Sequence, residues 1–406
     1  MRKPLPQPVR VYRVGGSVRD ELLGLPVADR DWVVVGATPE IMVASGYRPV
    51  GRDFPVFLHP ETHEEYALAR TERKSGAGYR GFAFFASPEV TLEDDLARRD
   101  LTINAMARAD DGTLVDPYGG ERDLREGVLR HVSPAFAEDP LRVLRVARFA
   151  ARFGFRVAPA TAKLMRAIAA AGELPTIAPE RVWTELARGL MEAHPSRMLV
   201  VLERCGALDA LLPGVGGGPG VARALDHGAR RGFALPVRYA VLANGFGAPV
   251  PADARARVRR AERISRHLCV PADCRELARL AARWRDRVQG ASGLTPAAWL
   301  RLFDAADALR RPERLDALVD ACECDALARP GARGPYAPRR LVNEAFAATR
   351  GVDAGAIATA LVGRASARGE RAGGGAIAKA VRTARLAALA AWRRGKQAGT
   401  STSARR

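Results

Sequence analysis

A pair of glycines and a pair of aspartates near the N-terminus constrain this chain more than any other feature. Gly15–Gly16 follow an apolar run at 11–14, while Asp29 and Asp31 precede another at 32–35. Glycines let the backbone approach a ligand closely, and the free N–H groups of a following helix favour a triphosphate. Residues i and i+2 of an extended chain share a face, so Asp29 and Asp31 can present two carboxylates together. Hard oxygen ligands in such a pair suit two Mg²⁺ ions and phosphoryl chemistry.

Each part of this pattern is weak by itself. A glycine pair is usually a turn, and an isolated Asp-x-Asp is usually a solvated loop. Their combination in this order, between two strand-like runs, favours the functional interpretation.

The charge balance indicates a polyanionic partner. The chain has 406 residues and a net charge of +19, from 64 basic and 45 acidic residues. Nucleic acid is the first expectation and a membrane surface the competing one. No apolar run approaches the roughly 20 residues that a membrane span requires, and residues 1–10 contain no apolar core of a secretory signal. The five cysteines are odd in number and scattered, so we expect reduced thiols in a cytoplasmic protein.

Strand-like runs alternate with short helices only in the first third of the chain. The candidate strands lie at 11–14, 32–35, 56–58, 65–69 and 113–115. Beyond Asp139 the apolar residues recur at helical spacing. The pattern predicts an α+β head with a mixed sheet, followed by an all-helical remainder.

A second candidate motif lies at 98–105. The adjacent Arg98 and Arg99 can bind phosphate oxygens through planar forks. Asp100 can hold an arginine in place or meet a sugar, and Asn104 can form a local hydrogen bond. Alone, this run is more often the exposed, charged start of a helix.

A third motif starts a helix near Pro140, with Asp139 as a suitable cap. Arg142, Arg145 and Arg148 recur every three residues and form a slanting stripe, opposite a face that can pack inside. Such a stripe is usually solvated. Here Asp139 and Arg142 together offer acceptors and donors that match the edge of a nucleobase.

The segment 69–82 is basic, rich in glycine and carries two aromatic residues. It predicts either a plain surface loop or a mobile element that closes over a nucleotide.

These motifs together resemble those of the bacterial class II CCA-adding enzymes, the tRNA nucleotidyltransferases, whose head is shared by the bacterial poly(A) polymerases. The resemblance is dense over about residues 11–155 and looser beyond. It rests on Gly15-Gly16-x-Val18-Arg19-Asp20, Asp29-x-Asp31, Arg98-Arg99-Asp100-x-Thr102-Ile103-Asn104-Ala105 and Glu138-Asp139-x-x-Arg142.

The resemblance implies roles for individual residues. Asp29 and Asp31 resemble the catalytic pair that binds Mg²⁺, and Gly16 and Arg19 resemble contacts to the triphosphate of ATP or CTP. The other residues that resemble nucleotide contacts are Arg99, the template pair Asp139 and Arg142, and the further arginines Arg145 and Arg148. The segment 69–82 resembles the flexible loop that helps switch from C to A addition.

The resemblance also implies a domain organisation. We expect a nucleotidyltransferase head at 1–137, a helical neck with the nucleotide-template helix at 138–213, a helical body at 214–330 and a helical, tRNA-binding tail at 331–406. Several enzymes of this branch carry an HD-type metal site in the body. Residues 241–246 lack the His-Asp pair expected there, so we predict a degenerate body without phosphohydrolase activity.

The function that follows is template-independent addition of C, C and A to the 3′ end of tRNA from CTP and ATP, with release of pyrophosphate. A poly(A) polymerase that uses ATP alone remains an alternative. A non-catalytic tRNA-binding module is an alternative of another class. We expect tRNA, CTP and ATP as partners, and neither a membrane nor a protein partner.

Overall fold

The computed structural model describes residues 5–6, 8–27, 29–50, 56–74, 82–247, 253–368, 371 and 373–403, without the side chains of 72–74, 82–84 and 397–403. The chain forms two compact units, residues 1–213 and 214–406. The finer division into head, neck, body and tail stays a prediction.

The first unit begins as a mixed sheet with helices, as the sequence predicts. Among the described residues a seven-stranded sheet has the order β3-β4-β5-β2-β1-β8-β9, and two small sheets pair β6 with β7 and β10 with β11. The strands are β1 Arg10–Val14, β2 Asp31–Val35, β3 Arg48–Val50, β4 Val56–Leu58, β5 Glu65–Leu68, β6 Arg70–Lys74, β7 Phe82–Ala86, β8 Ala107–Ala109, β9 Leu114–Val115, β10 Val128–Leu129 and β11 Arg156–Val157.

The central strand β2 explains the continuous apolar run at 32–35. It pairs in parallel with β5 and antiparallel with β1, so both of its faces lie inside the protein. Val33 packs into one hydrophobic cluster with Leu96, and Val34 packs into another with Phe57. Alternate side chains of a strand point to opposite faces, so a strand covered on both sides is apolar throughout. This burial fixes the start of β2, where Asp31 lies.

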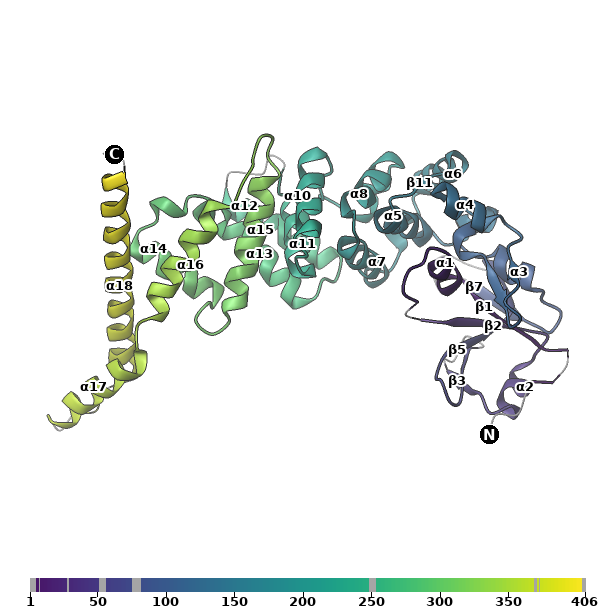
Figure 1. Ribbon diagram of the computed structural model, residues 1–406, viewed down its shortest axis with the longest axis horizontal. Coiled ribbons are helices and arrows are strands. Elements are labelled where there is room, and N and C mark those ends of the chain that lie inside the picture. The colour runs from purple at the N-terminus through teal and green to yellow at the C-terminus, as the bar shows by residue number, and fades with distance from the viewer. Residues whose placement is uncertain are drawn as a thin grey trace. The chain divides into compact units, whose positions relative to one another are not determined.

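Helices make up the rest of the first unit. Figure 1 shows α5, α7 and α8 beside the sheet-bearing part of this unit, and α5 packs against both α7 and α8. The helices are α1 Gly16–Leu22, α2 Pro39–Ala44, α3 Leu92–Ala97, α4 Gly120–Glu126, α5 Leu141–Phe153, α6 Pro159–Ala170, α7 Pro179–Met191, α8 Pro195–Arg204 and α9 Leu208–Leu211, with 3₁₀ turns at Thr102–Asn104, Pro134–Glu138 and Leu174–Thr176.

The second unit is helical throughout its described residues. Its α11 and α13 pack together, and α12 and α15 also contact α13. The helices are α10 Pro219–Arg230, α11 Leu235–Asn244, α12 Ala254–His267, α13 Ala272–Gln289, α14 Pro296–Ala306, α15 Pro312–Leu327, α16 Ala337–Arg350, α17 Ala354–Ser366 and α18 Gly374–Ser403, with a 3₁₀ turn at Ala291–Gly293.

One stretch of the second unit, residues 337–366, is long and apolar enough to cross a membrane by length and composition alone. It is not one helix, because residues 351–353 form a break between α16 and α17. Helix α16 buries Val342, Ala345 and Thr349 and packs against α18, and 17% of the apolar window is buried.

The prediction for the segment 69–82 was wrong at its ends. Residues 70–74 form β6 and pair antiparallel with β7, in the register Arg70 opposite Ala86. Its middle part, 75–81, lies outside the described residues. The sequence analysis also missed β3, whose Pro49 disfavours a strand. Because β3 is an edge strand of the sheet, the missing N–H of Pro49 costs it little.

Close packing in the first unit gives a testable consequence at Gly120. A Cβ added there would lie 2.3 Å from the carbonyl oxygen of Thr102 and 2.8 Å from Cγ of Met106. Backbone cannot yield as a flexible side chain does, so Gly120→Ala should destabilise the unit by about 2–3 kcal/mol. In thermal unfolding, the midpoint should fall by several degrees.

Gly363 in α17 serves as the matched control, since a Cβ there would meet nothing within 4 Å. Because alanine favours a helix interior, Gly363→Ala should stabilise by roughly 0.5–1 kcal/mol. Equal effects of the two substitutions would contradict the packing assigned to Gly120.

Candidate active site

A cavity of about 480 Å³ in the first unit is lined predominantly by arginine. Eight arginines and two aspartates line it, so its walls favour a polyanion such as a triphosphate. The lining residues are Gly15, Gly16, Arg19, Asp31, Arg98, Arg99, Asp100, Asn104, Arg142, Arg145, Arg148, Phe149, Arg152 and Arg188.

Arg98 and Arg99 are held by one buried carboxylate at the end of α3. The Asp95 Oδ1 atom accepts from Nη2 of Arg98 at 2.6 Å, and Oδ2 accepts from Nη2 of Arg99 at 3.1 Å. Burial opposes ionisation of Asp95, but Arg99 and Arg98 outweigh it and lower the pKa of this carboxyl. Asp95 therefore stays charged and fixes both guanidinium groups at the cavity.

Arg19 in α1 is buried against aromatic rings. Its guanidinium lies over Phe149 at 5.2 Å and over Phe153 at 5.1 Å, an arrangement that stabilises a desolvated cation. Its Nε donates to Asp20 Oδ1 at 2.8 Å, and its Nη1 donates to the side chain of Asn104. The backbone at Gly15 has φ of +69°, which glycine adopts without strain.

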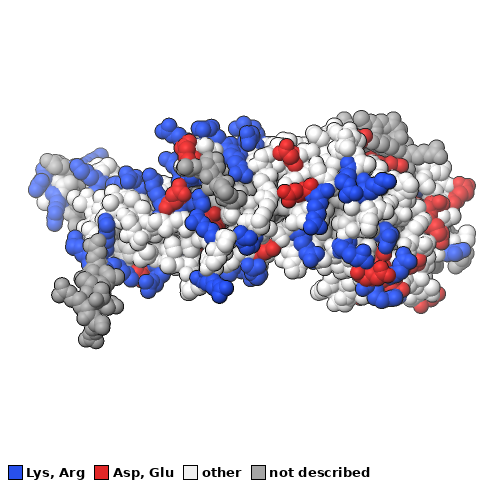
Figure 2. All heavy atoms as spheres, turned by 90° about the horizontal axis from the view of Figure 1, so that it is seen from above, with Lys and Arg blue, Asp and Glu red and all other residues white. Residues whose placement is uncertain are grey.

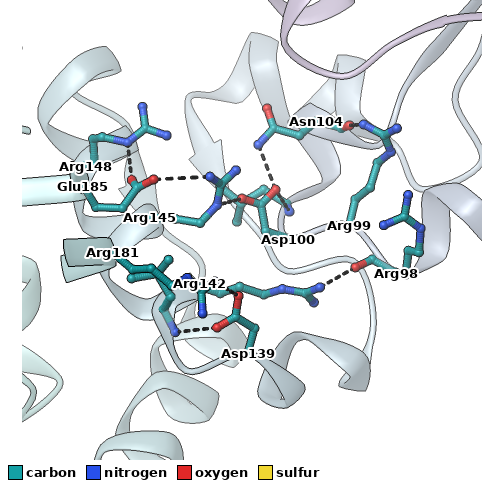
Figure 3. A network of polar contacts seen from close by, with 12 residues as sticks. Arg98, Arg99, Asp100, Asn104, Asp139, Arg142, Arg145, Arg148, Arg181 and Glu185 are labelled. Atoms are coloured by element: carbon teal, nitrogen blue, oxygen red, sulfur yellow. Dashed lines mark hydrogen bonds and ion pairs between the residues drawn. The ribbon is translucent and has the colours of Figure 1, made fainter. Parts of the chain in front are cut away.

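The arginine stripe of α5 is held by two carboxylates from other parts of the chain (Figure 3). Arg145 Nε donates to Asp100 Oδ2 at 2.8 Å, and Arg145 Nη1 donates to Glu185 Oε1 at 3.4 Å. Arg148 Nε donates to Glu185 Oε2 at 2.5 Å. The stripe is thus not the solvated face that such a pattern usually forms, because Arg142 and Arg148 are buried.

Asp139 and Arg142, the predicted template pair, are fixed at the start of α5. Asp139 Oδ1 accepts from the backbone N–H of Leu141 at 3.1 Å, and Oδ2 accepts from Arg181 Nη2 at 2.8 Å. Arg142 Nη1 and Nη2 donate to the carbonyl oxygens of Ala135 and Arg98, at 2.9 and 2.7 Å. Each group keeps further acceptor or donor positions for a ligand.

The predicted carboxylate pair lies at the start of β2. Asp31 begins the strand and lines the cavity, and Asp29 lies two residues before it, exposed to solvent. Although Asp31 keeps solvent contact, partial desolvation raises the pKa of its carboxyl. Asp29 adds to this rise and Arg99 opposes it. Within the described residues, neither carboxylate forms an ion pair, which suits the donor set of a divalent cation.

The cavity brings together seven of the nine predicted site residues. Asp29 and Asp139 lie outside its lining, although Asp139 is next to the lining residue Arg142 in Figure 3. Residues far along the chain that support the cavity were not among the predicted site residues. These are Arg152 at the end of α5 and, on α7, Arg181, Glu185 and Arg188; their spacing of three or four residues was the available signal.

In the second unit, a guanidinium neutralises a buried carboxylate near the place where the family resemblance implies a metal site. Arg285 Nε donates to Asp325 Oδ2 at 2.6 Å, and the N–H of Gly247 donates to Asp325 Oδ1 at 3.0 Å. Within the described residues, no group of three or more His, Cys, Asp and Glu side chains could hold a metal ion. The absence of phosphohydrolase activity stays a prediction.

Known proteins resemble this chain closely. Residues 11–130 match the family model of the poly A polymerase head domain, and residues 154–216 match that of a probable RNA- and SrmB-binding site of polymerase A. The multifunctional CCA protein of Leptothrix cholodnii is 53% identical over 94% of this chain and 96% of its own length. That of Dechloromonas aromatica is 54% identical over 87% of this chain and 92% of its own.

A solved structure has the same fold. The crystal structure of the Bacillus stearothermophilus CCA-adding enzyme in complex with CTP is 25% identical, with a TM-score of 0.64, and covers 98% of this chain and 95% of its own.

The ion pair between the buried Asp100 and the partly exposed Arg145 predicts a pH-dependent stability. Burial opposes ionisation of Asp100, but Arg145 outweighs it and lowers the pKa of this carboxyl far below its ordinary value. Stability from such a group is fully present above the pKa of the unfolded state, about 4, and is lost as pH falls towards the folded pKa. Asp100→Asn should lower the free energy of unfolding by about 3 kcal/mol at pH 7. The loss is no larger because Arg145 keeps Glu185 as a partner.

Urea unfolding between pH 7 and pH 3 measures this cost. The difference from the wild type should shrink below about pH 4. Asp110→Asn, which changes an exposed carboxyl of the same unit, should stay within about 0.5 kcal/mol of the wild type. A cost for Asp100→Asn that is constant over pH would contradict the ion pair as its cause.

Proposed function

The chain belongs to the family of the multifunctional CCA proteins, and we propose that it adds C, C and A stepwise to the 3′ end of tRNA from CTP and ATP, without a nucleic-acid template. The observation that carries this proposal is the arginine-lined cavity with Asp31 in its lining and Asp29 two residues before Asp31. Its charges suit a nucleoside triphosphate, and the open acidic pair suits a metal ion beside it.

Enzymes with this head generally use divalent metal ions, and we propose Mg²⁺ held by Asp29 and Asp31. The ion would supply stabilisation of charge on the attacking 3′-hydroxyl and on the pyrophosphate leaving group. The carboxylates of Asp29 and Asp31 suit this ion because they are hard oxygen donors. In the described part of the chain, no cationic side chain of the protein pairs with them.

The chain's own residues bind and orient the nucleotide in this proposal. Arg19, Arg99, Arg145 and Arg148 would contact the triphosphate and its sugar, since their guanidinium groups line the cavity and are held by carboxylates or rings. The pre-formed arrangement lowers the cost of ordering these side chains when the nucleotide binds. Gly16 would allow the phosphates to approach the backbone at the start of α1.

Asp139 and Arg142 would select the base. A carboxylate accepts hydrogen bonds and a guanidinium donates them, so together they can discriminate between base edges. Arg181 holds Asp139 Oδ2 from α7, and we propose that Arg181 positions this acceptor without touching the nucleotide.

The proposed function is tested by nucleotide addition. A tRNA that lacks its last three nucleotides should gain two C residues with CTP and Mg²⁺, and one further A when ATP is also present. Asp29→Asn and Asp31→Asn should each lower transfer by more than about 100-fold, because a metal ligand is lost. Both variants should retain tRNA binding, and Asp110→Asn should retain full activity.

Other outcomes separate the alternatives. A long A tract from ATP alone would move the assignment to poly(A) polymerase. No extension by the wild type, with tRNA still bound, would favour a non-catalytic binding module. Full activity of Asp31→Asn would overturn the carboxylate assignment.

The role of Arg181 gives a separate prediction. In Arg181→Ala, Asp139 loses its partner at Oδ2, so the preference of kcat/KM for CTP and ATP over UTP and GTP should fall by about tenfold. Stability should change little, and Arg181→Lys should restore part of the preference. Arg122→Ala, an exposed arginine of the same unit, is the control. An equal loss for all four nucleotides would indicate a purely structural role.

A further inference from the structure

A groove of the second unit is also lined by arginines. It has a volume of about 990 Å³ and lies along α12 and α13, with α14 and α15 each contributing one residue. On the face drawn in Figure 2, basic side chains gather in clusters and acidic side chains are fewer. The arginines of the groove are Arg255, Arg259, Arg279, Arg283, Arg287 and Arg314.

The three acidic residues of the groove are already engaged by the protein. Asp253 caps α12, since its Oδ1 and Oδ2 accept from the backbone N–H groups of residues 255 and 256 at 3.0 Å each. Glu276 pairs with Arg314 at 3.3 Å. Asp286 pairs with the buried guanidinium of Arg257. These carboxylates therefore do not neutralise the whole row of arginines.

Three arginines of the groove form no ion pair within the described residues: Arg255, Arg283 and Arg287. All three are exposed. On α13, Arg283 and Arg287 are four residues apart, so they lie on one face with a rise of about 6 Å between them. Since α12 packs against α13, Arg255 borders the same groove from a second helix.

A buried donor lies beside these cations. Trp284 is only 4% exposed, lines the groove, and its indole Nε1 has no hydrogen-bond partner in the described structure. A buried N–H without an acceptor is costly, and an oxygen of a ligand would remove that cost. The Arg287 guanidinium lies 4.5 Å from the centre of the Trp284 ring, a cation–π contact that orders this arginine before any ligand binds.

We infer that this groove is a second phosphate-binding site, separate from the arginine-lined cavity of the first unit. Single exposed arginines are normally solvated, but here they border one groove from two packed helices, and Trp284 with its buried donor lines the same groove. Guanidinium groups match phosphate oxygens through paired hydrogen bonds. The phosphates come either from the backbone of the RNA substrate, which rests on the proposed function, or from a free oligophosphate such as the pyrophosphate product.

Calorimetric titration of the full-length protein with inorganic tripolyphosphate tests the free-anion source. The wild type should bind two equivalents, one in each unit. Arg283→Glu should bind one, because charge reversal removes a contact and repels the phosphates. Arg230→Glu makes the same change of charge at an exposed residue of α10 outside the groove and should still bind two. Circular dichroism melts check folding, and Arg255→Glu replaces Arg283→Glu if the latter unfolds.

Titration with a tRNA that lacks its last three nucleotides tests the RNA source. Arg283→Glu should weaken tRNA binding about tenfold and lower the slope of log K against log salt by about 1. Arg230→Glu should change neither quantity by more than about twofold.

Each result decides the inference. Loss of the second tripolyphosphate equivalent alone assigns the groove to free oligophosphate, and weaker tRNA binding alone assigns it to the RNA backbone. One tripolyphosphate equivalent in the wild type, together with equal tRNA affinity of Arg283→Glu and Arg230→Glu, overturns it. Because these measurements record binding, a failure of nucleotide addition is distinguished from a failure of this site.

Discussion

Two buried carboxylates, Asp100 and Glu185, hold together the part of the structure on which the cavity depends. Arginines that line a common cavity repel one another, and this repulsion is strongest where water is excluded. Asp100 and Glu185 lie on either side of Arg145, and Glu185 also binds Arg148. The cavity therefore keeps an excess of positive charge in a fixed geometry, which a triphosphate can neutralise without rearranging the walls.

The sequence predicted what local rules determine. The apolar runs beside Asp29 and Asp31 predicted strands, and β2 is such a strand. The three-residue recurrence of arginines predicted one helix face, and these residues lie together on α5. In both cases neighbouring residues and the period of the element were sufficient.

The remaining features depend on contacts between distant residues. Glu185 is 85 positions from Asp100. The packing of α7 against α5 brings Glu185 to Arg145, and Asp100 reaches Arg145 from the segment between α3 and the 3₁₀ turn at Thr102–Asn104. The strand β6 was mistaken for loop because Arg70–Lys74 is a charged segment. Its backbone is satisfied by pairing with β7, an interaction that the composition of either segment does not reveal.

Carboxylates of the two units differ in whether an arginine neutralises them. In the second unit, Arg285 donates to the carboxylate of Asp325, which is only 1% exposed. The positive charge of Arg285 is therefore neutralised inside the protein. The positive charge of a guanidinium is permanent in proteins, so an arginine neutralises such a carboxylate. In the first unit, the carboxylates of Asp29 and Asp31 have no such partner in the described structure. A buried carboxylate that is already neutralised offers little to a metal ion, whereas an open acidic pair attracts one. This difference supports the proposal of metal-dependent chemistry in the first unit.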